Sequence, residues 1–149
     1  MGPFVDTTTS QPHTPGVQSP WVIEVEGLAA GYGDKVILHD VDVRFPRCKV
    51  TCIVGGSGSG KSTLLKTLVG LLPPMAGTVR VLGEDLYALD EEERGDLLAK
   101  VGYMFQYGAL LASLSVQDNL LIPLRAHTAL PLQLMREIVG LKLAQVGLG

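Results

Sequence analysis

Hydrophobic and polar residues alternate with a period of two in the first part of the chain. The stretches "WVIEVEGL" from Trp21 and "KVILHDVDVRF" from Lys35 show this alternation, which is typical of strands with one exposed face. "KVTCIVG" from Lys49 is apolar almost throughout, so it predicts a buried central strand. "GTVRVLGEDL" from Gly77 predicts another strand and a turn, and "VGYMF" from Val101 one more strand.

Helical spacing of apolar residues begins at Lys61. Leucines recur after it at helical intervals until Pro73-Pro74, which is expected to stop the helix. "LDEEERGDLLAK" predicts a second helix, with Asp90 as its N-cap and Glu93 completing a capping box.

Two more helices are predicted nearer the C-terminus. Ser115, with Asp118 three residues on, opens the first of them, and Pro123 is expected to end it. "PLQLMREIVGLKLAQVGLG" from Pro131 predicts an amphipathic helix with Gly147 as its C-cap. Because strands alternate with helices, the pattern indicates an α/β fold with a mainly parallel sheet.

Composition indicates a flexible tail followed by one globular domain. Residues 1–20 are rich in Thr, Ser and Pro and almost lack large apolar residues, so they cannot bury enough surface to become ordered. Order is expected to begin at Trp21, with residues 21–149 forming one domain. With a net charge of -3 and no apolar run of membrane-spanning length, we expect a soluble chain that has no nucleic-acid partner.

Cys48 and Cys52 are the only cysteines. Four residues apart on an extended segment, they would lie about 13 Å from one another, too far for a disulfide. Zinc would need further ligands, and the three histidines show no paired spacing. We therefore expect both thiols to be small, buried, apolar groups in a reducing compartment.

A glycine-rich loop precedes the helix at Lys61. Its residues fit the phosphate-binding pattern G-x-x-x-x-G-K-[ST]: Gly55, Gly56, Ser57, Gly58, Ser59, Gly60, Lys61 and Ser62. Bare backbone lets N–H groups wrap phosphate oxygens, and the N-terminus of the following helix favours negative charge. Lys61 would supply charge for the β- and γ-phosphates, and Ser62 a hydroxyl for Mg²⁺. The loop predicts nucleotide binding, and a glycine-rich turn without a ligand is the alternative.

Three stretches together resemble the first half of an ABC transporter ATPase: "GYGDKVILHDVDVRF", "GGSGSGKSTLLKTLVGLLPPMAGTVRVLG" and "VGYMFQ". The resemblance covers nearly everything after residue 20. It implies a P-loop NTPase core with an N-terminal antiparallel β-subdomain, whose C-terminal part is missing from these 149 residues. It also implies ATP and Mg²⁺ as ligands, held by Tyr32, by residues 55–62 and by Thr63. Lys61 is implied to be a catalytic residue that acts on the phosphates.

The same resemblance implies roles for two residues outside the loop. Tyr32 corresponds to the aromatic residue that stacks on adenine, which needs only flat apolar area on the ring; a turn tyrosine is the alternative. Gln106 corresponds to the glutamine that reaches Mg²⁺ and the attacking water, since an amide can coordinate metal or accept from water. The alternative for Gln106 is a polar surface residue.

The segment after Gln106, "YGALLASLSVQDNLLIPLRAHTALP", is similar to that of the ATPases of the Mla and Mce lipid transporters. This resemblance implies phospholipid or a related lipid as the cargo. Tyr107 and Ala126 depart from the expected pattern. The alternative is an ordinary helix end with Arg125 and His127 in solvent.

As an ABC ATPase, the protein is expected to hydrolyse ATP as a head-to-tail pair of copies bound to an integral membrane permease subunit. It would lie peripherally on the cytoplasmic side of the inner membrane. The 149 residues contain no "LSGG"-like string, so we expect this chain alone to be inactive. A P-loop small-molecule kinase, a GTPase and a non-catalytic nucleotide-binding module remain as alternatives, although the N-K-x-D string of a GTPase is absent.

Overall fold

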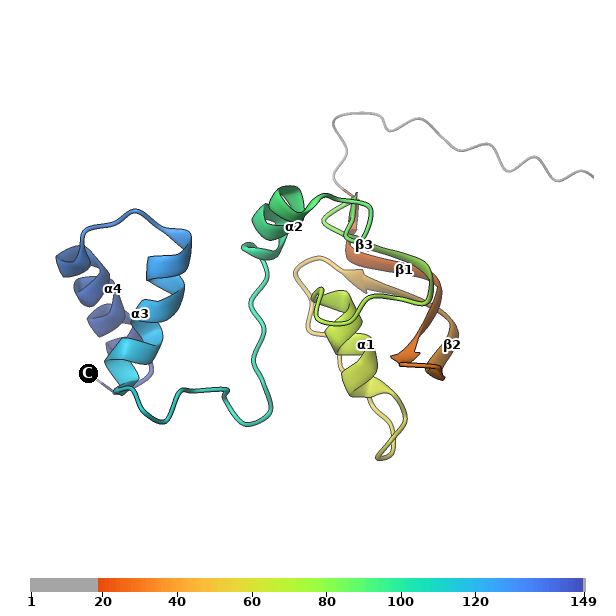
Figure 1. Ribbon diagram of the computed structural model, residues 1–149, viewed down its shortest axis with the longest axis horizontal. Coiled ribbons are helices and arrows are strands. Elements are labelled where there is room, and N and C mark those ends of the chain that lie inside the picture. Colours follow the sequence, from red (N-terminus) through yellow and green to blue (C-terminus); the bar gives the residue numbers. More distant parts are fainter. Residues whose placement is uncertain (1–18, 149) are drawn as a thin grey trace, which may run out of the picture. The chain divides into compact units, whose positions relative to one another are not determined.

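The protein is described by a computed structural model that covers residues 19–148 (Figure 1). The predicted flexible tail at residues 1–20 lies almost entirely outside the described residues. The chain divides into two compact units, Met1–Asp90 and Glu91–Gly149. Each unit is described by itself.

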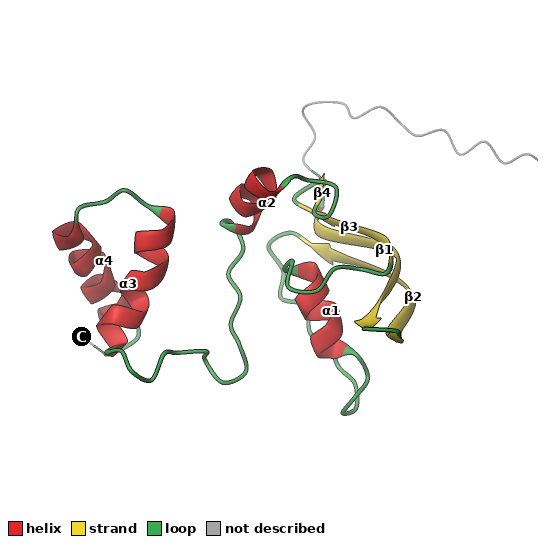
Figure 2. Cartoon of the chain, in the orientation of Figure 1, coloured by secondary structure: helices red, strands yellow, loops and turns green. Residues whose placement is uncertain are grey.

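The first unit contains a four-stranded antiparallel sheet with the strand order β2-β1-β3-β4 (Figure 2). Its strands are β1 (Trp21–Tyr32), β2 (Lys35–Pro46), β3 (Ala76–Val81) and β4 (Glu84–Asp85). The two alternating stretches therefore form the expected strands and pair as a hairpin. The turn between them holds Gly33 with a φ of 55°, a left-handed conformation that glycine adopts at little cost.

One face of this sheet packs on helix α1 (Lys61–Leu68), which contacts β1, β2 and β3. Val25 on β1 pairs with Val79 on β3, and both side chains are buried. Helix α1 contributes the buried residues Leu64 and Leu68. The alternation of the strands thus places the core between α1 and the sheet.

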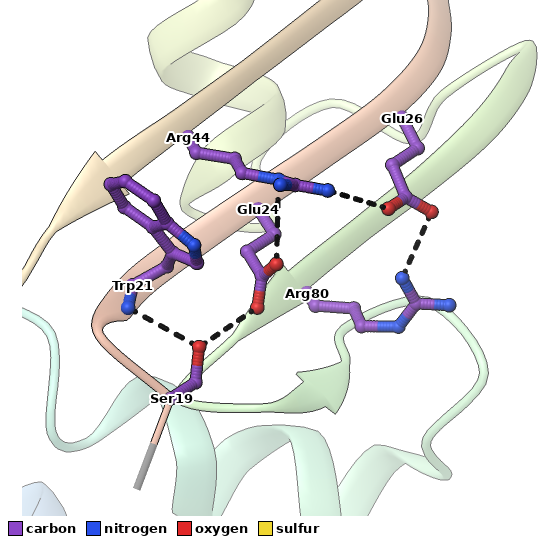
Figure 3. A network of polar contacts seen from close by, with 6 residues as sticks. All are labelled: Ser19, Trp21, Glu24, Glu26, Arg44 and Arg80. Carbon is purple, nitrogen blue, oxygen red and sulfur yellow. Dashed lines mark hydrogen bonds and ion pairs between the residues drawn. The ribbon is translucent and has the colours of Figure 1, made fainter. Parts of the chain in front are cut away.

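The opposite face of the sheet carries a ladder of charges (Figure 3). Glu24 and Glu26 flank Val25 on β1 and so point away from it. Arg44 on β2 lies 3.6 Å from each of the two carboxylates, and Arg80 on β3 lies 3.1 Å from Glu26. Pairs this exposed contribute little stability, but opposite charges on adjacent strands favour the observed register.

Two predicted strands are wrong. Residues 49–55 form no strand, and Val50 and Val54 are 95% and 88% exposed. Residues 101–105 are also without strand pairing. The physical reason is that a strand needs a hydrogen-bonded neighbour, and within residues 19–148 none pairs with either segment. The predicted mainly parallel sheet is accordingly not seen, and Cys48 and Cys52 are exposed rather than buried.

Helix α1 ends at Leu68, five positions before Pro73, the first of the two prolines that were expected to stop it. Gly70 takes a left-handed φ of 78°, and the Leu71 N–H donates to the Lys66 carbonyl over 2.9 Å. This is a glycine-terminated helix end that satisfies the last carbonyl groups. The glycine therefore ends the helix before the prolines can.

The second unit contains helices α2 (Glu91–Leu98), α3 (Val116–His127) and α4 (Leu132–Gln145). The predicted helix after Asp90 is confirmed, while its capping box stays a prediction. Helices α3 and α4 pack through a small apolar cluster of Leu121, Met135 and Val139.

The ends of α3 and α4 follow the sequence signals with one correction. Ser115 is the N-cap of α3, since its side chain accepts from the Asp118 N–H over 3.0 Å. Pro123 lies inside α3 and does not end it. A proline removes one donor but has a helical φ, and α3 continues for another turn in which Leu124 packs on the cluster. Gly147, with a φ of 76°, follows the end of α4 as expected.

Candidate functional site

The glycine-rich loop and the start of α1 form one wall of a pocket of about 220 Å³ in the first unit. The end of β1 and the start of β2 form the other wall. The lining residues are Tyr32, Ile37, Gly58, Ser59, Gly60, Lys61, Ser62 and Thr63. The structure thus brings Tyr32 to the loop, as expected, although the two are distant in the sequence.

Two glycines of the loop are required by its backbone. Gly60 has a φ of 90°, and a Cβ there would lie 2.6 Å from Cδ2 of Leu38 and 3.3 Å from Cγ2 of Ile37. Gly58 has a φ of 79° in open space, which disfavours any side chain on conformational grounds alone. The phosphate-binding pattern does not require glycine at position 58, so this requirement is visible only in the structure.

Helix α1 presents an N-terminus without a side-chain cap. Gly60 occupies the N-cap position and makes no side-chain hydrogen bond, and the first turn holds no acidic residue. The first N–H groups of a helix have no partner within the helix, and they carry the positive end of the helix dipole. This end of α1 therefore suits an anion.

The Lys61 side chain lies across the loop. Its ammonium group donates to the carbonyl oxygens of Gly55 and Gly56 over 2.8 and 2.6 Å and lies 3.4 Å from the Ser59 hydroxyl. These contacts hold a full positive charge against the concave backbone of the loop. Lys61 is only partly buried, so an anionic ligand could reach its charge from the pocket.

Tyr32 ends β1, paired with Lys35 directly before the hairpin turn, and is 48% exposed. The Lys66 ammonium lies 3.3 Å from its hydroxyl oxygen. Hydrogen bonds from Lys66, and after it from Thr63, lower the pKa of the Tyr32 phenol below its usual value, because both favour the ionised oxygen.

Gln106 lies in the second unit, on an exposed turn after residues 101–105. The described pocket consists of residues of the first unit only, so the role of Gln106 stays a prediction. Ser57, exposed in the loop, does not line the pocket. Between residues 19 and 148 no group of three or more His, Cys, Asp or Glu could hold a metal ion. The hydroxyl groups that line the pocket belong to Tyr32, Ser59, Ser62 and Thr63.

Two contributors to the site escaped sequence reasoning. Ile37 lines the pocket, and the helix residue Lys66 contacts Tyr32. The alternation of apolar and polar residues along β2 predicts which side chains are buried. It does not predict that Ile37 contacts the glycine-rich loop. The contact of Lys66 joins residues 34 positions apart, and no local pattern reports such a contact.

Residues 38–147 match the family described as "ABC transporter". The chain is 41% identical over 127 residues to an intermembrane phospholipid transport system ATP-binding protein, MlaF, of Haemophilus influenzae, covering 85% of this chain and 48% of that protein. It is also 41% identical to the "Probable ribonucleotide transport ATP-binding protein mkl" of Mycobacterium bovis, covering 85% of this chain and 35% of that one. The chain thus spans about half the length, or less, of these relatives.

Solved structures show the same likeness. The ATP-binding cassette MJ0796, in a dimeric post-hydrolysis state with ADP and Pi, matches with a TM-score of 0.70 and 25% identity, over 78% of this chain and 53% of that one. The cbiO1 protein of Clostridium perfringens, part of the transporter complex cbiONQ, matches with a TM-score of 0.70 and 27% identity, over 87% and 51%.

Proposed function

This chain belongs to the ABC transporter family and has the family's P-loop NTPase fold with an N-terminal antiparallel β-subdomain, and we propose on that premise that it binds Mg-ATP to power a membrane transporter. The observation that carries the proposal is the join between the loop and α1. There an uncapped helix N-terminus, a left-handed Gly60 and the Lys61 ammonium converge on one pocket. Each of these features favours a polyphosphate.

Lys61 would bind the phosphates by exchanging its contacts with the loop carbonyls for phosphate oxygens. Ser62 follows it in the first turn of α1 and lines the same pocket, so its hydroxyl would hold Mg²⁺ together with phosphate oxygens, the ligand type that this ion prefers. When bound, Mg²⁺ neutralises charge on the β- and γ-phosphates. The N–H groups of residues 58–63 would surround the phosphates from the opposite side.

Tyr32 would orient the base. Its ring lines the pocket that the loop forms and is about half exposed, so a flat apolar surface is available beside the phosphate site. A purine stacked on it would gain contact area at a low entropy cost, because a tyrosine side chain has few rotatable bonds.

Hydrolysis of ATP belongs to the same proposal. Gln106 would help to orient the attacking water and contact Mg²⁺, in an assembly of two copies placed head to tail. MJ0796 is described as a dimeric cassette, and cbiO1 as part of a transporter complex; these neighbours support a dimer bound to a membrane permease. Within residues 19–148 no helix is long and apolar enough to cross a membrane. We place the protein peripherally on the cytoplasmic face of the inner membrane.

For the cargo we propose phospholipid. The segment Tyr107 to Pro131 lies in the part of the chain that would face the permease, and relatives named for phospholipid transport match across 127 residues. The relatives named for ribonucleotide transport match at the same identity and give the competing cargo. In the protein reconstituted with its permease in vesicles, we expect phospholipid to stimulate ATP hydrolysis. Stimulation by ribonucleotide alone would reverse the assignment.

Lys61→Ala tests the nucleotide site itself. Each charge-assisted hydrogen bond lost is worth roughly 1.5–3 kcal/mol, so we expect MgATP affinity to fall by more than tenfold. The free energy of unfolding should change little, because Lys61 is only partly buried. Calorimetric titration of wild type and variant with MgATP measures the effect, and Lys142→Ala on α4 serves as the charge-matched control. Equal affinity in wild type and Lys61→Ala would remove Lys61 from the site.

A further inference from the structure

Lys66 lies on α1, five positions after Lys61, and contacts a different element. Its ammonium group is 3.3 Å from the Tyr32 hydroxyl oxygen and 5.5 Å from the centroid of the ring. The shorter distance to the oxygen puts the charge at the hydroxyl end of the ring and not over its centre. The contact is therefore mainly a charge-assisted hydrogen bond, and it does not occupy the flat surface of the ring.

Thr63, on the same helix, lines the pocket together with Tyr32. Thr63 and Lys66 are three positions apart on α1, so they lie on the same side of the helix. Both act on the Tyr32 phenol, Lys66 more strongly, and together they lower its pKa. Helix α1 thus holds the hydroxyl end of a ring whose backbone belongs to β1.

This attachment has a consequence for ligand binding. Residues 61–63 of α1 line the pocket at the phosphate loop, while Lys66 fixes the ring that forms another part of the same pocket. One rigid helix therefore sets the position of the aromatic ring relative to the phosphate site. A ring held in place before binding loses less freedom when a ligand arrives, which favours affinity.

We propose that Lys66 is a positioning residue for the nucleotide base: it holds Tyr32 by its hydroxyl so that the ring is oriented for stacking at a distance set by α1. The proposal rests on the proposed nucleotide-binding function. Lys66 is not among the residues that line the pocket, so it acts through Tyr32 and not on the ligand.

The experiment compares Lys66→Met, which keeps the length of the stem but removes the charge and the donors, with Lys66→Arg, which retains both. Lys142→Met on α4 is the control for loss of one positive charge. Affinities for MgATP and for Mg-tripolyphosphate, which lacks a base, are measured in the protein as its gene encodes it. Tyr32→Phe and the double variant with Lys66→Met complete a cycle.

We expect Lys66→Met to weaken MgATP binding by about threefold to tenfold, with Lys66→Arg and Lys142→Met near wild type. Tripolyphosphate affinity should not change. Because Lys66 acts through the Tyr32 hydroxyl, adding Lys66→Met to Tyr32→Phe should cost little more than Tyr32→Phe alone. The pKa of Tyr32, followed by NMR with ring-labelled tyrosine, should rise in Lys66→Met.

The outcomes that would contradict the role of Lys66 differ from those that would contradict nucleotide binding itself. Unchanged MgATP affinity in Lys66→Met, additive losses in the cycle, or an equal loss for tripolyphosphate would each overturn the positioning role. If wild type itself binds no MgATP, or Lys61→Ala binds as well as wild type, the proposed function fails instead. A Lys66→Met variant that unfolds is replaced by Lys66→Gln, for which the same comparisons decide.

Discussion

Gly60 is both the N-cap residue of α1 and a lining residue of the pocket. It buries its backbone against Leu38 and Ile37 while its own carbonyl accepts the first hydrogen bond of α1, from the Leu64 N–H over 2.8 Å. Any side chain would have to displace the end of the Leu38 side chain and would crowd Ile37, which lines the pocket. Close packing therefore fixes the loop before any phosphate binds.

Gly60→Ala should destabilise the first unit by about 1–3 kcal/mol. An alanine would be strained at a φ of 90° and would overlap Leu38. Gly56→Ala is the matched control, because a Cβ there meets nothing within 4 Å. Urea unfolding of both variants against wild type measures the difference. Equal unfolding free energies for the two variants would show that the loop relaxes around position 60 without cost.

At the scale of elements, the strands found from sequence are those whose partners lie nearby. β1 and β2 are joined by a two-residue turn and pair with each other, so their alternation of apolar and polar residues was sufficient to predict both. Residues 49–55 also contain a run of apolar residues, yet they form no strand because no neighbour pairs with them. Composition indicates that a segment can be buried, but only a partner makes it a strand.

Helix ends were predictable where the signal is local. The Ser115 cap and the Gly147 end are confirmed because each depends on residues within one turn. The end of α1 was placed too late because Gly70 acts before the prolines do. Pro123 was expected to end α3, but the helix continues past it, since packing of α3 on α4 outweighs the loss of one backbone donor. The same holds for the candidate site. The glycine-rich loop could be predicted because its pattern is local, whereas the contact of Lys66 with Tyr32 joins distant residues and could not.

Asn119 organises the loop that leads into α3. Its side chain accepts from the Leu111 N–H over 2.8 Å and donates to the Leu111 carbonyl over 3.1 Å, and it also donates to the Ser115 carbonyl over 2.9 Å. A single amide therefore fixes the loop to the helix. This loop belongs to the segment that we propose contacts the permease.

Asn119→Ala should release this loop while leaving α3 and α4 packed, because Asn119 lies outside the apolar cluster of the two helices. We expect the Leu111 amide to exchange its hydrogen at least tenfold faster, since its acceptor is lost. Hydrogen exchange followed by NMR measures this, with Gln117→Ala on the first turn of α3 as the control. If exchange at Leu111 is unchanged, the hydrogen bonds of Asn119 do not hold the loop.

At the scale of the whole molecule, binding and turnover need different sets of residues. The pocket of the first unit combines Lys61, Ser62 and Tyr32, which suit binding of a nucleotide. Phosphoryl transfer also requires the attacking water to be oriented and its developing charge to be stabilised. Among residues 19–148, no carboxylate lines this pocket. The sequence of 149 residues contains no "LSGG"-like string through which a second copy could close on the phosphates.

We therefore expect the 149-residue chain by itself to bind MgATP and not to hydrolyse it. Lys61 and the helix N-terminus stabilise charge already present on the bound phosphates, so they favour the ground state and the transition state alike and give little acceleration. The measurement is phosphate release by the purified chain, with Lys61→Ala as the control for contaminating ATPases. Turnover of about 1 s⁻¹, within the usual range for enzymes, that disappears in Lys61→Ala would show that residues of this chain supply the missing catalytic groups.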